Sequence, residues 1–422
     1  MSRWASRCFA YFGLSYYSQG VIAALQAAQG DVARTVAGET NLSSTVAQSL
    51  ILAGLCIAVI RAPDRYWRLC GPLIPVLGVL GFALLSVLWS SDPARSLRRS
   101  VALSECVLFG MFLFQAGGLE RTVGRVGRVC VTMAVLSLLA YVALPSIGRE
   151  TASGYEQAMR GVFPQKNSMA ECMLLGLCCY AYRLVAAPRW HHGAAALLLI
   201  MCLGLGRGAS ALAVAGVVCL VAVWLRLQGN PLLRAVLLFL VGWSVVAVAV
   251  ALIVSPQEVF ALVGRDASLT GRVPLWQAIW PEILQAPVIG YGYAAFWDAN
   301  APAVQMIWRY SGWPAPDAHS SYLDILLQLG AVGLILYMVV WTRLFTAARD
   351  ALRTGLGSAR FVLIYGTTLL LAGLDEGVIP IPNAWTALLP VTLLAMARYR
   401  SLYRAAHRIP LPETTSPNHY FP

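Results

Sequence analysis

Four short segments of this 422-residue sequence carry basic side chains between long apolar runs. They are Arg160–Asn167, Gly206–Ser210, Thr270–Arg272 and Ala318–Asp324. Because an arginine offers a permanent charge and a planar fork of donors, several converging arginines fit a diphosphate better than a carboxylate. We therefore predict that these segments build a diphosphate site. Its cationic candidates are Arg160, Lys166, Arg207 and Arg272.

Arg207 is the sharpest candidate among these cations. A turn of two or three residues between apolar helices gains nothing from a charge, which costs a few kcal/mol if it lies at membrane depth. Such a residue usually lines a wet cavity. The alternative is that Arg207 extends to lipid headgroups or caps the end of a helix.

The chemistry expected at this site is sugar transfer from a lipid diphosphate. The leaving diphosphate gains negative charge, which either a divalent metal or fixed cations can stabilise. The sequence indicates no outward cluster of carboxylates, because Asp92 is isolated and the adjacent pair Asp375 and Glu376 stands alone. We therefore expect a reaction that needs neither metal nor cofactor.

A sugar hydroxyl that attacks the anomeric carbon also benefits from a base whose pKa lies near neutrality. His319 is the only histidine that we place on the outer side of the membrane. A lone histidine at a helix start is more often structural, but its position among outward arginines favours a catalytic role. On the helix expected to follow, Tyr322 should share the face of His319, whereas Asp324 should point elsewhere.

The elements that position these residues are expected to be membrane helices. Of all residues 59% are hydrophobic and 12% are charged, and the mean hydropathy is +0.67, so the chain reads as an all-α membrane protein. About twelve spans are expected. They cover residues 6–26, 44–60, 69–89, 100–117, 127–145, 167–187, 192–205, 208–225, 233–254, 320–342, 359–374 and 384–398.

The distribution of arginine predicts the orientation of these spans. With both termini in the cytoplasm, most basic residues lie inside and the four chemistry-bearing segments lie outside. The net charge of +12 therefore reflects membrane orientation rather than binding to nucleic acid. We expect one membrane domain over residues 1–409 and a disordered cytoplasmic tail over 410–422. The first helix is expected to remain uncleaved, although it could pass for a signal peptide.

The longest outward connection, residues 255–320, should be folded because it is too long for a passive linker. Residues 274–284 space their apolar side chains along one helical face, which predicts an interfacial helix that Pro281 can kink and Pro287 ends. The loop is rich in aromatic residues, among them Trp313. They fit either a belt at the membrane surface or a platform for sugar rings.

These segments together resemble the bacterial O-antigen ligase and O-antigen or exopolysaccharide polymerase superfamily, including its ExoQ-like branch. The most specific resemblance lies in the order and spacing of residues 271–280, 287–296 and 318–333. Weaker support comes from residues 85–93, 160–167 and 206–210.

The resemblance implies transfer of a glycan from undecaprenyl diphosphate to an acceptor hydroxyl at the periplasmic face of the bacterial inner membrane. It also implies a fold similar to the multi-helix (C-type) glycosyltransferases. The catalytic residues would be His319, Arg272 and Arg207. The substrate-binding residues would be Arg160, Lys166, Asn167, Tyr322 and Trp313. The acceptor is either another lipid-linked repeat, as in a polymerase, or lipid A core, as in a ligase, and we favour the polymerase.

A secondary transporter is the alternative from another class. The stretch Asp64–Arg68 is similar to a loop of the major facilitator transporters, but the long loop here is outward and late rather than cytoplasmic and central. The stretch Gly290–Tyr293 also echoes a potassium filter, without the Thr-Val that should precede it. We therefore favour the enzyme.

Overall fold

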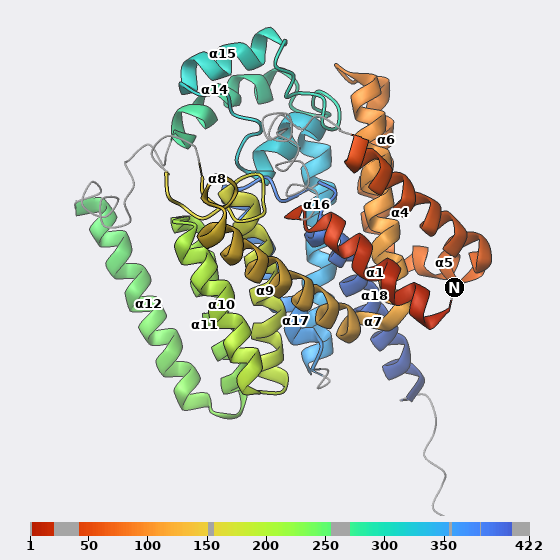
Figure 1. The fold of residues 1–422 in the computed structure, drawn as a ribbon, viewed down its shortest axis with the longest axis vertical. Helices are drawn as coiled ribbons and strands as arrows, with labels where there is room; N and C mark the ends of the chain where they lie inside the picture. Colours follow the sequence, from red (N-terminus) through yellow and green to blue (C-terminus); the bar gives the residue numbers. More distant parts are fainter. Residues whose placement is uncertain are drawn as a thin grey trace, which may run out of the picture.

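The computed structural model describes residues 2–20, 42–150, 156–254, 271–353, 357–379 and 381–406. Throughout these ranges the regular elements are helices, and the chain forms one isolated bridge, Arg149 with Met159. The expected all-α class is confirmed (Figure 1). The elements are α1 (Arg3–Tyr17), α4 (Leu42–Arg61), α5 (Pro63–Cys70), η1 (Gly71–Leu73), α6 (Ile74–Leu85), η2 (Ser86–Leu88), α7 (Pro93–Ala143), α8 (Pro145–Gly148), α9 (Lys166–Ala186), α10 (Trp190–Leu205), α11 (Ala209–Arg226), η3 (Leu227–Gly229), α12 (Pro231–Val254), α14 (Arg272–Gln285), α15 (Pro302–Ser311), α16 (Ser321–Arg353), α17 (Ala359–Asp375) and α18 (Ala384–Ala406).

Six helical segments in the described ranges are long and apolar enough to cross a membrane. They are Ser43–Arg61, Pro63–Leu88, Pro93–Ala143, Lys166–Ala186, Ala209–Gly229 and Ser321–Arg353, and shorter apolar helices accompany them. The chain is therefore a membrane protein, although this count does not reach twelve. Helix α1 ends at Tyr17, and residues 21–26 of the first expected span lie outside the described residues.

Helix α7 joins the fourth and fifth expected spans without a loop. Its helical geometry breaks only at Gly117 (φ 178°, ψ 0°) and Gly118 (φ 68°, ψ −171°), and the positive φ of Gly118 favours glycine. Side chains of the following turn satisfy carbonyls near the break: Thr122 donates to Gly118 over 2.7 Å, and Arg125 donates to Ala116 over 3.4 Å. Two glycines therefore replace the short cytoplasmic connection that we expected.

A second break divides α16 at Gly330 (φ 61°, ψ −163°). The glycine-rich segment before α15 supplies partners at this break. Tyr291 and Gly292 donate to the carbonyls of Leu327 and Gln328 over 2.8 and 2.9 Å. On the other side of the break, Ala331 donates to Pro287 over 2.9 Å. Backbone groups freed inside a membrane helix need such partners. The sequence that echoed a potassium filter thus satisfies backbone carbonyls of α16 at its break.

Helix α9 lies at the centre of the bundle, packed against α7, α10, α11 and α17. Of its most apolar window 72% is buried inside the protein, against 11% for α4. The residues at the outer end of α9 are therefore held by helices on several sides. This burial makes α9 the rigid reference for the site described below.

Helices α14 and α15 form a cap at one end of the bundle (Figure 1). Leu275, Ile279 and Ile283 of α14 pack into a small core that includes Leu327 of α16. Trp280 and Leu284 stay 52% and 61% exposed. The expected helix is confirmed, and it continues through Pro281 to Gln285. Its apolar residues split, however, because one stripe packs into the core of the cap itself.

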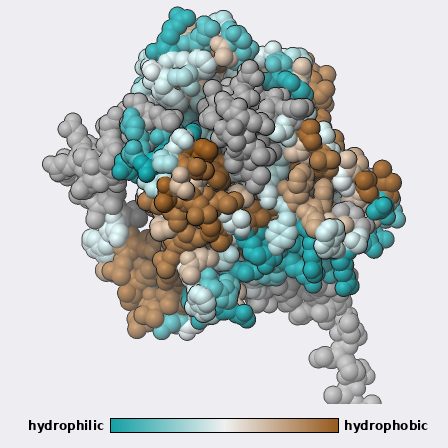
Figure 2. All heavy atoms as spheres, in the orientation of Figure 1, coloured by the Kyte–Doolittle hydropathy of each residue, from teal (hydrophilic) through white to brown (hydrophobic). Residues whose placement is uncertain are grey.

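The outer surface of the bundle is apolar where helices would meet lipid. Figure 2 shows hydrophobic residues over α10, α11 and α12 on one side and over α4 and α6 on the other. On α12, Leu232, Phe239 and Trp243 are each at least 60% exposed. Such an exposed apolar surface fits a lipid environment.

Candidate active site

The site is centred on Asp375 and Glu376, at the C-terminal end of α17. Side chains from three other parts of the chain converge on Glu376. Arg272 donates to it over 2.6 Å, Asn167 donates to it over 2.8 Å, and His319 Nδ1 lies 3.3 Å from it. Residues more than 200 positions apart therefore share one carboxylate.

Arg272 is the first residue of α14 and is 7% exposed. One terminal nitrogen pairs with Asp375 and the other with Glu376. The preceding Gly271 has a φ of 81°, and a Cβ there would lie 3.1 Å from Nε1 of Trp313. A glycine at this position therefore lets the backbone carry Arg272 toward the two carboxylates beside the Trp313 ring.

His319 precedes α16 in a left-handed conformation with a φ of 44°. Its backbone donates to Asp317 over 2.8 Å, and its ring lies 5.3 Å from the ring of Trp313. Burial acts to lower the pKa of His319, but the hydrogen bond with Glu376 and the charges of Asp317 and Glu376 outweigh it. The net effect raises the pKa and favours the imidazolium.

A small cavity of about 40 Å³ adjoins these groups between α9, α11 and α17. Lys166 and Asn167 line it from the start of α9, and Gly206 and Gly208 line it from the turn between α10 and α11. Asp375 and Glu376 close the opposite wall. At this size the cavity holds a few water molecules and no sugar. All four predicted segments thus meet beside the carboxylates, two at the cavity and two through Arg272 and His319.

Arg207 lies in the turn between α10 and α11, exposed, with a φ of 51°. The two glycines that flank it line the cavity, but Arg207 itself lies outside its walls. Two of the five described non-glycine residues with positive φ are therefore Arg207 and His319. Strained backbone of this kind tends to occur at functional sites.

Arg160 is buried against backbone rather than at the carboxylates. Its guanidinium donates to the carbonyls of Ile147, Ser146 and Pro164 over 2.9, 3.2 and 3.4 Å. In this structure it ties the segment before α9 to the end of α7 and α8.

The expected relation between Tyr322, Asp324 and His319 is wrong. His319 lies in a turn before α16, so helical spacing does not apply to it. Tyr322 donates to Leu370 of α17 over 2.8 Å. Asp324 instead folds back onto the turn, where it accepts from the Ala318 amide over 3.2 Å and from Trp297 over 2.8 Å. Asp324 therefore contacts the turn that holds His319, whereas the Tyr322 hydroxyl contacts α17.

Three buried polar atoms around His319 have no hydrogen-bond partner within the described ranges of the chain. They are His319 Nε2, Trp313 Nε1 and Asp375 Oδ2. A buried donor or acceptor without a partner costs about 1–3 kcal/mol.

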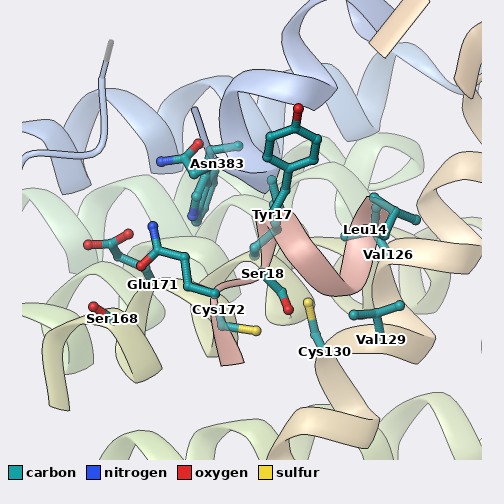
Figure 3. A pocket seen from close by; sticks show the side chains of 14 residues that line it. Leu14, Tyr17, Ser18, Val126, Val129, Cys130, Ser168, Glu171, Cys172 and Asn383 are labelled. Carbon is teal, nitrogen blue, oxygen red and sulfur yellow. The ribbon is translucent and has the colours of Figure 1, made fainter. Parts of the chain in front are cut away.

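Glu171 on α9 lines the cavity of about 40 Å³ beside Asp375 and Glu376. It also lines a second cavity of about 20 Å³. Figure 3 shows the second cavity, with Tyr17 and Ser18 of α1 and Cys130 of α7 on its other walls. An acidic residue inside a membrane helix usually has a functional reason. The sequence placed Glu171 within a span and gave it no role.

The carboxylates themselves are what the sequence interpretation missed. Asp375 and Glu376 were read as an isolated pair, whereas the fold brings them to Arg272, Asn167 and His319. An acidic pair directly after an apolar span was the signal that could have identified them. Their partners lie too far away in sequence for spacing to indicate the pairing.

This arrangement defines a helical membrane protein with a polar site at one end of its bundle, built from a central helix, a loop cap and the end of α17. Residues 193–338, which include Arg207, Arg272 and His319, match the family described as O-antigen ligase. The chain is also 25% identical over 307 residues to the exopolysaccharide production protein ExoQ of Rhizobium meliloti (strain 1021), covering 69% of this chain and 68% of that protein. The resemblance to this superfamily is confirmed, and it supports a role as a polysaccharide polymerase or ligase.

Proposed function

We propose that this protein is a polysaccharide polymerase that transfers a glycan from undecaprenyl diphosphate to a sugar hydroxyl at the periplasmic face of the inner membrane, without a metal. The convergence of Arg272, His319 and Asn167 on Glu376 carries the proposal. The buried polar atoms without partners around His319 are costly in a closed protein, and a polar ligand offsets that cost.

The donor diphosphate would be held by guanidinium and ammonium groups. Arg272 uses two of its five donors on Asp375 and Glu376, which leaves three N–H groups for phosphate oxygens. Lys166 lines the cavity, and Arg207 lies between the two glycines that line it. Because the cavity holds only a few waters, the donor must widen it or bind across its mouth.

The reaction forms a bond between the acceptor oxygen and the anomeric carbon and breaks the bond from that carbon to the diphosphate. The acceptor proton passes to Nε2 of neutral His319, which is buried and has no partner in the described structure. Glu376 and Asp317 stabilise the resulting imidazolium. Trp313, whose ring lies 5.3 Å from that of His319, offers an aromatic face to the acceptor sugar.

The acceptor distinguishes two candidate activities. Similarity to an exopolysaccharide production protein favours a lipid-linked repeat as acceptor and hence a polymerase. The family match described as O-antigen ligase favours lipid A core as the second candidate. A secondary transporter would need neither acceptor.

The testing experiment supplies membranes that contain the protein with undecaprenyl diphosphate-linked repeats and a chelator. Chain growth and transfer to lipid A core are read separately. We expect His319→Ala to lower the rate at least about 10²-fold, the contribution of a general base, and Arg272→Lys to lower it because the bidentate fork is lost. Arg349→Gln, at an exposed position of α16 that pairs with Asp350 and not with the carboxylate cluster, is the control. Wild-type rates in both site variants would contradict the proposal and return weight to transport.

A further inference from the structure

A second polar site lies where α1, α4, α5 and the break of α7 meet, away from the carboxylate cluster. It is an open groove of about 510 Å³. Arg61, Asp64, Arg65 and Gln115 form its polar walls, while Ala58 and Phe112 form apolar ones. Nothing in the proposed glycan transfer uses this groove.

The charge around the groove is strongly positive. The guanidinium groups of Arg61 and Arg65 form no ion pair or hydrogen bond within the described parts of the chain, and Asp64 is the one acidic residue in the groove walls. Arg7, Arg121 and Arg128 act electrostatically on Arg125, next to the groove. Gathered like charges are unfavourable without a counterion.

Two polar groups beside the groove have no hydrogen-bond partner among the residues that the structure describes. Nε2 of Gln115, which lines the groove, is buried without a hydrogen bond. Arg125 is 6% exposed, and one terminal nitrogen caps the carbonyl of the groove residue Ala116, whereas the other has no partner. Two buried donors are thus available to an anion.

The surroundings of the groove are those of a membrane surface. Trp67 of α5 is 79% exposed, which is typical of an aromatic anchor at the water interface. On α4, next to Arg61, Ile57 and Ile60 are 47% and 76% exposed. Figure 2 shows a hydrophilic band where α1 begins and α7 runs, below the hydrophobic surface of α4 and α6. A ligand here meets cations at one end and apolar helix surface at the other.

We propose that this groove binds the phosphate headgroup of an anionic phospholipid of the surrounding membrane, with its acyl chains along the exposed face of α4. The headgroup phosphate accepts from Arg61, Arg65 and Gln115, as basic pockets between membrane helices do for acidic lipids. Free phosphate offers the same charge, but it would leave the apolar walls of the groove uncovered.

Native mass spectrometry of the full chain in neutral detergent tests this proposal. We expect the protein to retain phosphatidylglycerol and to release phosphatidylcholine. The double variant Arg61→Gln/Arg65→Gln should weaken retention roughly thirtyfold, at about 1 kcal/mol for each arginine near an anionic lipid. Arg61→Lys/Arg65→Lys keeps both charges and should retain most of the binding.

The matched control is Arg349→Gln/Arg353→Gln on α16, which removes two charges from an exposed helix end and should leave retention unchanged. Gln115→Glu offers a second variant if the double variant does not fold, and its added negative charge should weaken binding. Equal retention of phosphatidylglycerol by the wild type, by Arg61→Gln/Arg65→Gln and by Gln115→Glu would overturn the site. Full displacement by millimolar inorganic phosphate would overturn the lipid as its ligand.

Discussion

At the scale of single residues, Glu376 is the carboxylate on which the charges and hydrogen bonds of the site depend, because three side chains share it. It accepts from Arg272 and Asn167, and its second oxygen lies 3.3 Å from His319. Its backbone carbonyl also accepts from the hydroxyl of Ser321 over 2.8 Å, which locks the end of α17 to the start of α16. Removing the charge of Glu376 should therefore change the protonation of His319 while Ser321 keeps the backbone in place.

The first prediction concerns the pH dependence of Glu376→Gln. The hydrogen bond and charge of Glu376 raise the pKa of His319 against the effect of burial, so the variant should lower that pKa. If neutral His319 is the base, the rising limb of kcat/KM against pH moves to lower pH. The measurement is a pH profile of glycan transfer in membranes.

Two further variants sharpen this prediction. Asp317→Asn removes another charge that raises the same pKa and should move the limb in the same direction. Asp375→Asn changes a partner of Arg272 rather than of His319 and should leave the limb in place. An unmoved limb in both Glu376→Gln and Asp317→Asn would mean that His319 only orients the acceptor.

At the scale of elements, glycine breaks decide how the outer loop meets the bundle. A Cβ at Gly330 would lie 2.3 Å from the backbone of Val288, and one at Gly290 would lie 2.5 Å from that of Gln328. Both positions also have positive φ. The loop strand and the open turn of α16 therefore fit together only with glycine at both positions.

The second prediction follows from this contact. Gly330→Ala should destabilise the protein by at least about 1–3 kcal/mol, the cost of backbone strain alone, because backbone atoms cannot yield to the new methyl group. Gly81→Ala on α6, where a Cβ meets nothing within 4 Å, should be neutral or slightly stabilising. The measurement is the midpoint of heat-induced loss of the monodisperse size-exclusion peak. Equal midpoints for the two variants would contradict the role of this break.

At the scale of the whole molecule, orientation decides whether the site can reach periplasmic substrates. The arginine distribution predicts that Arg207 lies outside and Arg349 inside, and both side chains are exposed. Lys166 is the single lysine of the sequence. The chain therefore permits side-specific amine labelling with little background.

The third prediction uses two chains that each carry one lysine, Lys166→Arg/Arg207→Lys and Lys166→Arg/Arg349→Lys. A membrane-impermeant amine reagent should label position 207 in intact spheroplasts and position 349 only after permeabilisation. Peptide mass spectrometry locates the label and separates it from the N-terminal amine. The reverse pattern would place the carboxylate cluster in the cytoplasm and exclude a periplasmic reaction.

The sequence alone predicted the all-helical class and the bounds of several helices, and it indicated some of the residues that the structure brings together. The expected spans 167–187, 192–205 and 208–225 agree closely with α9, α10 and α11, because the apolar runs that lipid requires are local features of the sequence. Charged residues beside such runs are costly without a function, and this cost indicated Arg272. His319 was indicated as the only histidine predicted on the outer side, and the structure brings both residues to Glu376.

Only the tertiary structure placed Asp375 and Glu376 at the centre of these residues. It also showed that Tyr322 of α16 donates a hydrogen bond to α17. The structure also shows a helix break within α7 where a loop was expected. The glycine motif of residues 290–293 supplies hydrogen-bond partners to the break in α16. These outcomes depend on how helices distant in sequence pack and on which backbone groups that packing leaves without partners. No local pattern of residues carries that information, since a carboxylate shared by α9, α14 and the turn before α16 exists only once α17 lies between them.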